Sequence, residues 1–405
     1  MLVHIATLGC KVNQYESDRI IANLKQNGIG ISDTWLNADV VIVNSCVVTN
    51  RAEQKSSSLL RKIKRENPDA RLILTGCMAD KKHGDYGQTD IGNDRKVEVV
   101  LQTIGIHSAA ITGAGGAYER TRAYIKIQDG CNAFCSYCII PFVRGRERDE
   151  SFDDIIAEAS NAVNNGFREI VLTGIHTGRF KRLAELLDAL EAIEGLQRIR
   201  LSSIELREVD EQLVRRFQYG SKIVPHLHIP LQSGSDTVLK AMKRPYTRQE
   251  FIDRCNELRS LIPELGITTD IIVGFPQETD DDFQQTLDVI EQLAIHRVHV
   301  FPYSQREGTP ASEMTEQVSA EVKKLRAAKA RTHAFNIFRR FCADQADKVH
   351  KVLIEEYQKN DIVAGYTENY IYTEFTCQGG LVNQITDVVL TEPIGSSFAC
   401  KAKRV

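Results

Sequence analysis

Three cysteines fall within eight positions of the stretch DGCNAFCSYCIIPFVRGR, which spans residues 129–146. Their spacing is Cys131-x3-Cys135-x2-Cys138. Structural zinc usually takes four protein ligands and closes its shell, so a zinc site here would need a fourth ligand from elsewhere in the chain. A [4Fe–4S] cube normally takes one thiolate on each iron, so three thiolates leave one iron open for a substrate or cofactor. The spacing therefore favours an open iron–sulfur site, with zinc as the alternative.

The composition is that of an ordinary globular protein, with 42% hydrophobic and 26% charged residues. The 405 residues suffice for two or three domains, and the net charge of −3 gives no overall basic field for nucleic acid. The N-terminus lacks a signal-peptide pattern, and no apolar run approaches the roughly 20 residues of a membrane helix. We therefore expect a cytoplasmic protein, in which clustered cysteines indicate metal or catalysis more often than disulfides.

The N-terminal part alternates between strand and helix patterns. Short apolar runs rich in β-branched residues at 2–8, 39–44 and 71–76 predict strands, and the stretches at 14–29 and 49–66 predict helices. This alternation predicts a parallel sheet with helices on its faces.

A further cysteine follows each of these three predicted strands, at Cys10, Cys46 and Cys77. The carboxyl ends of parallel strands share one edge of a sheet, where α/β proteins bind ligands. Half-buried core cysteines are common, and three of them are the alternative interpretation. Because all three hold equivalent positions, we expect the thiols to converge on a second metal site.

A second alternating series follows a glycine-rich linker near 113–117. Six strand candidates begin near residues 124, 169, 198, 225, 268 and 297. The helical candidates lie near 152–165, 181–193, 208–218, 235–243, 248–261 and 280–293. Six βα units in a row predict a barrel or an incomplete one, whose active face is formed by the loops after its strands. The Cys131 loop would then lie on the rim, after the first strand.

A long basic helix is predicted near 318–343, and short β-type runs predict a small all-β module over about 348–405. The predicted fold is therefore α/β, with domains at 1–115, 116–343 and 344–405.

The triplet, with Tyr137 just before its third cysteine, resembles the radical S-adenosylmethionine (radical SAM) superfamily. The resemblance implies an incomplete (β/α)6 barrel and an open iron that chelates the amino and carboxylate groups of S-adenosylmethionine. It also implies cofactor contacts beside the triplet and at the ends of later strands. The candidates are Tyr137, Thr173, Gly174, Ser203, Glu205, Gln232 and Gly274. The superfamily's common Gly-Gly-Glu motif is absent, and LTGIHTG stands in its place.

TLGCKVNQYES, the dispersed cysteines, CSYCIIPFVRGRER and the β-rich tail together resemble the methylthiotransferases over essentially the whole chain. This resemblance implies a small C-terminal RNA-binding domain of the TRAM type and two [4Fe–4S] clusters. One cluster would be held by Cys131, Cys135 and Cys138, the other by Cys10, Cys46 and Cys77. Residues 11–16 look most like the branch that modifies N6-threonylcarbamoyladenosine 37 of tRNA, because other branches differ after the first cysteine.

The resemblance implies that a 5′-deoxyadenosyl radical, formed from S-adenosylmethionine, removes the hydrogen of adenine carbon 2. A methylthio group then joins that carbon, and an electron donor such as a flavodoxin or ferredoxin is required. Two alternatives keep the chemistry but act on isopentenyl-adenosine in tRNA or on a ribosomal-protein aspartate. A third alternative is a non-catalytic zinc protein that binds nucleic acid.

Local charge and aromatic residues indicate how the anticodon arm of tRNA would bind. Arg144, Arg146 and Arg148, the basic helix at 318–343, and the run of Lys and Arg over 51–65 could neutralise phosphates. In the tail, Tyr366, Tyr370 and Tyr372 are candidates for stacking on bases, with at least one of them expected in the core instead.

Overall fold

The structure is a computed structural model that describes all residues except 82–88, 94, 107–119, 378 and 380. Its N-terminal part is a five-stranded parallel sheet with the strand order β2-β1-β3-β4-β5. In chain order the strands are β1 (Leu2–Thr7), β2 (Gly30–Ile31), β3 (Val40–Ser45), β4 (Arg71–Gly76) and β5 (Thr89–Ile91). The predicted parallel sheet is confirmed, and it gains two short strands, β2 and β5.

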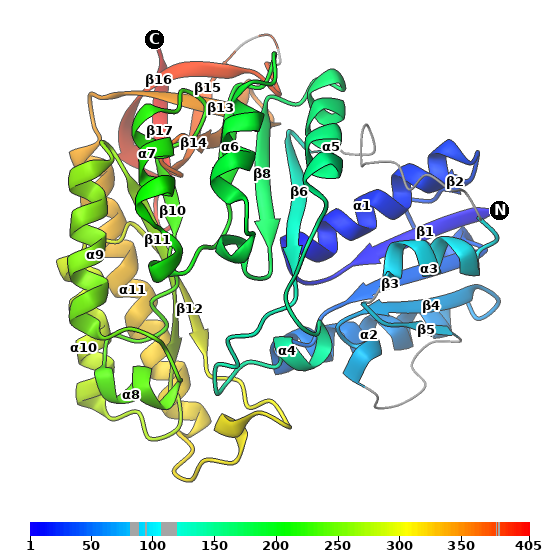
Figure 1. Ribbon diagram of the computed structural model, residues 1–405, viewed down its shortest axis with the longest axis horizontal. Coiled ribbons are helices and arrows are strands. Elements are labelled where there is room, and N and C mark those ends of the chain that lie inside the picture. The colour runs from blue at the N-terminus through cyan, green and yellow to red at the C-terminus, as the bar shows by residue number, and fades with distance from the viewer. Residues whose placement is uncertain (82–88, 94, 107–119, 378, 380) are drawn as a thin grey trace.

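Helices cover both faces of this sheet (Figure 1). They are α1 (Lys11–Gln26), α2 (Asn50–Glu66) and α3 (Lys96–Thr103). Alternate side chains of β3 serve the two faces: Val41 and Val43 pack in the cluster that holds α2, and Ile42 in the cluster that holds α1 and α3. Because β3 is buried on both faces, its apolar residues form a continuous run, Val40 to Val43, instead of alternating with polar ones.

The central part is an incomplete barrel of six parallel strands. They are β6 (Arg122–Asp129), β8 (Glu169–Gly174), β9 (Arg198–Leu201), β10 (His226–His228), β11 (Gly266–Val273) and β12 (Arg297–Pro302). Isolated bridges such as Ser203 to His228 join β9 to β10. No pairing joins β12 to β6 among the described residues, and the predicted open (β/α)6 barrel is confirmed.

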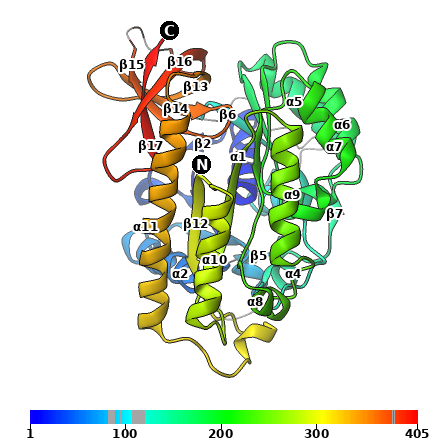
Figure 2. The same ribbon diagram turned by 90° about the vertical axis from the view of Figure 1, so that its left-hand side faces the viewer.

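Seven helices accompany the barrel strands, and α11 runs beside β12 and α10 to reach the C-terminal strands (Figure 2). The helices are α5 (Phe152–Asn164), α6 (Leu183–Glu191), α7 (Glu211–Tyr219), α8 (Asp236–Ala241), α9 (Arg248–Leu261), α10 (Asp280–Gln292) and α11 (Ala320–Asp344). Two further elements, α4 (Ile140–Val143) and β7 (Arg148–Asp149), were not predicted. The barrel strands are apolar toward these helices, where Ile170 and Leu172 pack, and polar toward the lumen, where Glu169 and Arg200 pair at 2.8 Å.

The C-terminal part is a closed barrel with the strand order β13-β14-β15-β17-β16. The strands are β13 (Val349–Tyr357), β14 (Ile362–Thr367), β15 (Tyr372–Thr376), β16 (Ile385–Pro393) and β17 (Ala399–Arg404). This barrel docks on the amino ends of the central strands, where Arg122 pairs with Glu355 at 3.0 Å. The predicted small all-β module is confirmed.

Two tyrosines of the tail lie in this interface. The ring of Tyr370 stacks on Tyr366 and also on His226 of the central barrel, with ring centroids 4.4 Å apart in both pairs. These two rings are therefore not free to stack on bases, in line with the expectation that at least one of the three tyrosines is buried. They fill the floor of the central barrel instead, beneath Arg122 and Arg200.

The predicted domain boundaries stay predictions. The one at 115/116 and the linker at 113–117 lie outside the described residues, and the one at 343/344 falls at the end of α11 (Ala320–Asp344). Among the helices of the described residues, none has the length and apolar character that crossing a membrane requires.

Candidate active site

The loop with Cys131, Cys135 and Cys138 follows β6 directly, on the rim of the barrel. The backbone closes the loop on itself: the Cys131 N–H donates to Gly145 O at 3.1 Å, and the Cys138 N–H donates to Cys135 O at 3.0 Å. Burial raises the pKa of the Cys138 thiol to about 12, and the neighbouring Cys135 and Cys131 raise it further. The three thiols therefore lie close together, and burial keeps the thiol of Cys138 neutral until a cation binds.

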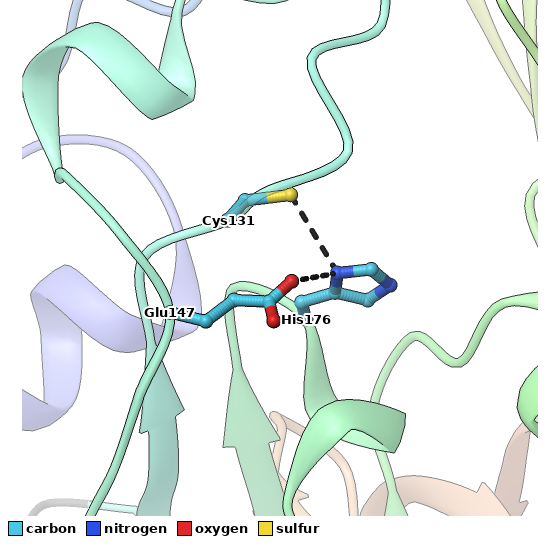
Figure 3. A group of neighbouring side chains, drawn as sticks. All are labelled: Cys131, Glu147 and His176. Carbon is cyan, nitrogen blue, oxygen red and sulfur yellow. Dashed lines mark hydrogen bonds and ion pairs between the residues drawn. The ribbon is translucent and has the colours of Figure 1, made fainter.

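Figure 3 shows the side chains of Cys131, Glu147 and His176 pointing toward one another. His176 Nδ1 lies 3.6 Å from Cys131 Sγ and 3.1 Å from Glu147 Oε1, and His176 Nε2 lies 2.7 Å from Glu208 Oε1. Burial lowers the pKa of His176, but its contacts with Cys131 and Glu208 raise it more, to about 10. His176 therefore places a cation beside the cysteine loop.

A second cation reaches the loop from a different element. Arg244 Nη1 lies 3.5 Å from Cys135 Sγ, and the same guanidinium pairs with Glu205. Glu205 was predicted to contact the cofactor, but Arg244 was not singled out, because the sequence does not reveal that this arginine folds back onto the cysteine loop.

The three N-terminal cysteines also converge. Cys10, Cys46 and Cys77 directly follow or lie just beyond β1, β3 and β4, and β1 and β3 flank the point where the strand order reverses. A Cβ on Gly9 would lie 3.2 Å from Cys46 Sγ, so the first two loops touch. Burial raises the pKa of the Cys46 thiol to about 11, and the nearby Cys77 and Cys10 raise it further.

A groove of about 390 Å³ opens beside this second group of thiols. It is lined by Leu8, Gly9, Thr49, Arg51, Ala52 and Lys55. Each triplet combines exposed or half-buried thiols with at least one buried thiol and has cations nearby, which is a donor set that fits an iron–sulfur cluster. Ligation by these six cysteines stays a prediction.

One buried arginine spans the space between the two groups. Arg144 follows the barrel triplet, and its fully buried guanidinium donates to Asp129 Oδ1 at 3.1 Å, to Glu16 Oε1 at 3.2 Å and to Asn13 Oδ1. It also opposes the effect of burial on the pKa of the Cys77 thiol. The expectation that Arg144 binds phosphate is therefore wrong, since its donors are engaged inside the protein.

Glu16 gathers three cations around this point: Arg144, Lys96 and Lys126. Burial raises the pKa of Glu16, but these cations lower it further, to about 2. The N-terminal sheet and the barrel rim are thus joined by a fully buried ion-pair network.

The other predicted cofactor contacts lie on the same rim, at or just beyond the carboxyl ends of successive strands. Thr173 and Gly174 end β8, Ser203 follows β9, and Gln232 follows β10. Tyr137 packs instead with an apolar cluster beside the loop. The roles of these residues stay predictions.

Gly274 follows β11, and its N–H already donates to Glu278 Oε2 at 2.6 Å. This amide is therefore engaged within the turn, and any contact of Gly274 with a cofactor would have to use other atoms.

Two family models match the chain. The radical SAM superfamily matches residues 125–290, and a family described as uncharacterized protein family UPF0004 matches residues 2–97. Among solved structures, the radical SAM methyltransferase TsrM from Kitasatospora setae is similar, with a TM-score of 0.57, 14% identity and 77% of each chain covered. This likeness concerns the fold.

Curated relatives cover nearly the whole chain. A threonylcarbamoyladenosine tRNA methylthiotransferase MtaB from Bacillus subtilis is 37% identical over 94% of this chain and 92% of its own. A protein of the same name from Thermotoga maritima is 39% identical over 92% and 91%. A tRNA-2-methylthio-N(6)-dimethylallyladenosine synthase from Carboxydothermus hydrogenoformans is 34% identical over 96% of each chain.

The open barrel, with its three-cysteine loop on the rim, defines a radical SAM enzyme, for which S-adenosylmethionine and one [4Fe–4S] cluster are the implied cofactors. The second group of cysteines and the closed C-terminal barrel belong to no part of that core. With them, the chain belongs to the radical SAM methylthiotransferase family.

Proposed function

We propose that this protein is a tRNA methylthiotransferase that inserts a methylthio group at carbon 2 of N6-threonylcarbamoyladenosine 37. The relatives from Bacillus subtilis and Thermotoga maritima carry that activity in their names. The observation that carries the proposal is the approach of two cysteine groups, from separate parts of the chain, to the region of one buried arginine, Arg144. In this proposal the nucleotide base is bound between the two groups.

In this proposal Cys131, Cys135 and Cys138 hold one [4Fe–4S] cluster, and Cys10, Cys46 and Cys77 hold a second. When bound, these clusters and S-adenosylmethionine supply the 5′-deoxyadenosyl radical and the methylthio group. The protein's own contribution is positional. His176 and Arg244 stabilise the barrel thiolates, and the network of Arg144, Glu16 and Asp129 fixes the two groups relative to each other.

The exposed basic residues of α2 border the groove beside Cys10 and are the proposed contacts to the anticodon arm. Arg51 and Lys55 line that groove directly. Reduction of the clusters would require an electron donor such as a flavodoxin or ferredoxin. The proposal places the enzyme in the cytoplasm, where its tRNA substrate is found.

The first experiment is the iron and acid-labile sulfide content after anaerobic purification, for the wild type and for the Cys10→Ala/Cys46→Ala/Cys77→Ala variant. We expect about eight irons in the wild type and about four in the variant. Four irons in both proteins would remove the second cluster from the proposal. Zinc in place of iron would overturn the proposed enzyme and leave a nucleic-acid-binding protein.

The activity test follows with the same two proteins and tRNA that carries N6-threonylcarbamoyladenosine 37. Mass spectrometry of the digested tRNA should show the added methylthio group with the wild type only. If the wild type modified isopentenyl-adenosine tRNA instead, the neighbouring branch of the family would be the right assignment.

A further inference from the structure

The segment that follows Cys10 contains one cation, the ammonium group of Lys11, that has no partner among the described residues. Asn13 donates to Leu8 O at 2.7 Å and to Ser45 O at 2.8 Å, which ties α1 to the ends of two strands. Glu16 holds the ion-pair network described above. Lys11, the first residue of α1, has no hydrogen-bond acceptor or carboxylate within bonding distance among the residues that the structure describes.

Lys11 begins α1, which packs against β6 and β8 of the central barrel, where Tyr15 contacts Tyr124 and Val171. The charge of Lys11 interacts with charged groups on three strands of the barrel. These are Glu169 on β8, Arg200 on β9 and Asp270 on β11. Since these strands stand on different sides of the lumen, the ammonium group lies between them. Arg122 and Arg200 repel this ammonium group and Glu169 attracts it. Since Lys11 has no ion pair of its own among the described residues, an anion entering from the rim would be attracted to it.

Hydrogen-bonding groups line the lumen near this cation. His228 Nε2 lies 3.2 Å from Asp270 Oδ1, and His228 Nδ1 lies 2.9 Å from Thr268 Oγ1. The side chain of His299 reaches the same place, with a ligand atom within 4.8 Å of those of His228 and Asp270. This wall offers both donors and acceptors to a polar group that carries a hydroxyl or an amide.

The chemistry of the proposed substrate matches this arrangement. In N6-threonylcarbamoyladenosine, the group on N6 carries a carboxylate, a hydroxyl and amide N–H donors. Carbon 2 and the carbon that bears N6 flank the same ring nitrogen, so a base with carbon 2 at the cysteine rim can extend its N6 group into the lumen. An isopentenyl group has no polar atom, and its burial against Lys11 would leave that charge desolvated and unpaired.

We propose that Lys11 binds the carboxylate of the threonylcarbamoyl group and thereby selects this nucleoside over adenosines whose N6 group is uncharged. The inference rests on the proposed function and names the residue that sets its substrate preference. The hydroxyl of the same group lies against the wall formed by His228, Asp270 and His299.

The test is RNA binding by the anaerobically reconstituted full-length protein. Three anticodon stem-loop RNAs are compared by fluorescence anisotropy: one with threonylcarbamoyladenosine 37, one with its methyl ester, and one with unmodified adenosine 37. The protein variants are Lys11→Gln, which keeps the length but removes the charge, and Lys25→Gln as the control. Lys25 is exposed in the last turn of the same helix. The iron content of each variant is measured first, because Lys11 adjoins Cys10.

We expect the wild type and Lys25→Gln to bind the carboxylate-bearing RNA about 10- to 100-fold more tightly than the ester, as for a hydrogen bond between charged groups. In Lys11→Gln, with the same iron content, this ratio should fall to near one, while binding of unmodified RNA stays unchanged. An unchanged ratio in Lys11→Gln would overturn the role of Lys11.

This outcome is separable from the proposed function. If the wild type failed to methylthiolate the threonylcarbamoyladenosine RNA, the proposed function itself would fall. If it did so and Lys11→Gln kept the full preference for the carboxylate, the role of Lys11 alone would fall.

Discussion

The two cysteine groups offer the same three thiols but are built in different ways. The barrel group comes from one loop, which is closed by its own backbone hydrogen bonds at Cys131 and Cys138. The N-terminal group comes from the ends of three strands, and exists only when the sheet orders β1, β3 and β4 side by side. A site made by one loop can be recognised from spacing, whereas a site made by a sheet edge requires the topology.

The cations around the two cysteine groups also differ in where they come from. The barrel thiols have His176 and Arg244, both from the barrel itself. The N-terminal thiol of Cys77 has Lys96 from its own domain and Arg144 from the barrel. The N-terminal site is therefore incomplete without the barrel, while the barrel site is complete without the N-terminal sheet.

The largest expected effect comes from removing one cysteine of each group. Cys131→Ala should abolish both cleavage of S-adenosylmethionine and methylthiolation, by at least ~1000-fold. Cys77→Ala should abolish methylthiolation but retain cleavage, because the barrel group is intact. The 5′-deoxyadenosine formed and the modified tRNA are both measured by liquid chromatography with mass detection. Cys255→Ala, at a buried cysteine of α9 outside both groups, is the control. Loss of cleavage in Cys77→Ala would contradict the independence of the barrel site.

The second effect is on stability. Arg144→Met removes the buried guanidinium that Glu16 and Asp129 share and leaves them only lysines or an exposed arginine as partners, so the free energy of unfolding should fall by about 3–5 kcal/mol. The loss should be accompanied by loss of iron from the N-terminal site before the barrel site. Urea denaturation and iron analysis measure the two effects. Arg146→Met, at an exposed neighbour, should change the stability by less than about 0.5 kcal/mol. A comparable loss in both variants would show that the ion-pair network has no special role.

The third effect is on the pH dependence of the free energy of unfolding, and it concerns the barrel only. Burial raises the pKa of Glu169, but Arg200, Arg198 and Arg122 lower it further, from 4.5 to about 2. Its stabilising contribution is present above pH 4.5 and is lost as the pH falls toward 2, by up to about 3 kcal/mol. In Glu169→Gln the free energy of unfolding should depend less on pH in this window, as followed by circular dichroism. Because Glu169 lies at the barrel floor, iron content at neutral pH should stay unchanged in both sites. An unchanged acid dependence would show that Glu169 is not held ionised in the folded state.

A smaller effect is expected at the barrel site alone. Arg244→Gln removes the cation beside Cys135 and leaves Glu205 unpaired. Cleavage of S-adenosylmethionine should fall about 10-fold, which corresponds to one charge-assisted hydrogen bond. Iron at the N-terminal site should not change. Arg207→Gln, which breaks an exposed ion pair, is the control, and equal losses in the two variants would count against a local role for Arg244.

The smallest effect concerns the groove beside the N-terminal site. Each of Arg51→Gln and Lys55→Gln should weaken tRNA binding to a similar degree for all sequences. The slope of log affinity against log salt should decrease by about one for each phosphate that the variant no longer neutralises. Filter binding at several salt concentrations gives this slope. An unchanged slope would place the RNA on another face.

Much of the architecture could be predicted from the sequence, because its signals are local or periodic. The alternation of strand and helix patterns predicted the sheet and the barrel, and the cysteines could be assigned to strand ends. The short strands β2 and β5 escaped prediction, since two or three residues carry no period.

Burial of charge could not be predicted. Arg144, Arg146 and Arg148 look alike in the sequence, yet only Arg144 is fully buried, because its partners Glu16 and Asp129 are brought to it by tertiary contacts. Which of the tail tyrosines is buried could not be predicted for the same reason, since the surface that Tyr370 covers belongs to another domain.

The floor of the barrel has a consequence for how this chain tolerates change. Arg200 donates to the main-chain carbonyls of Glu368 and Thr367 at 3.1 and 3.2 Å, and Arg198 donates to Tyr366 O at 3.2 Å. A carbonyl is present whatever the side chain, so the tail can vary at these positions and still be recognised. At these carbonyls the constraint therefore falls on the two arginines rather than on the identity of the tail residues.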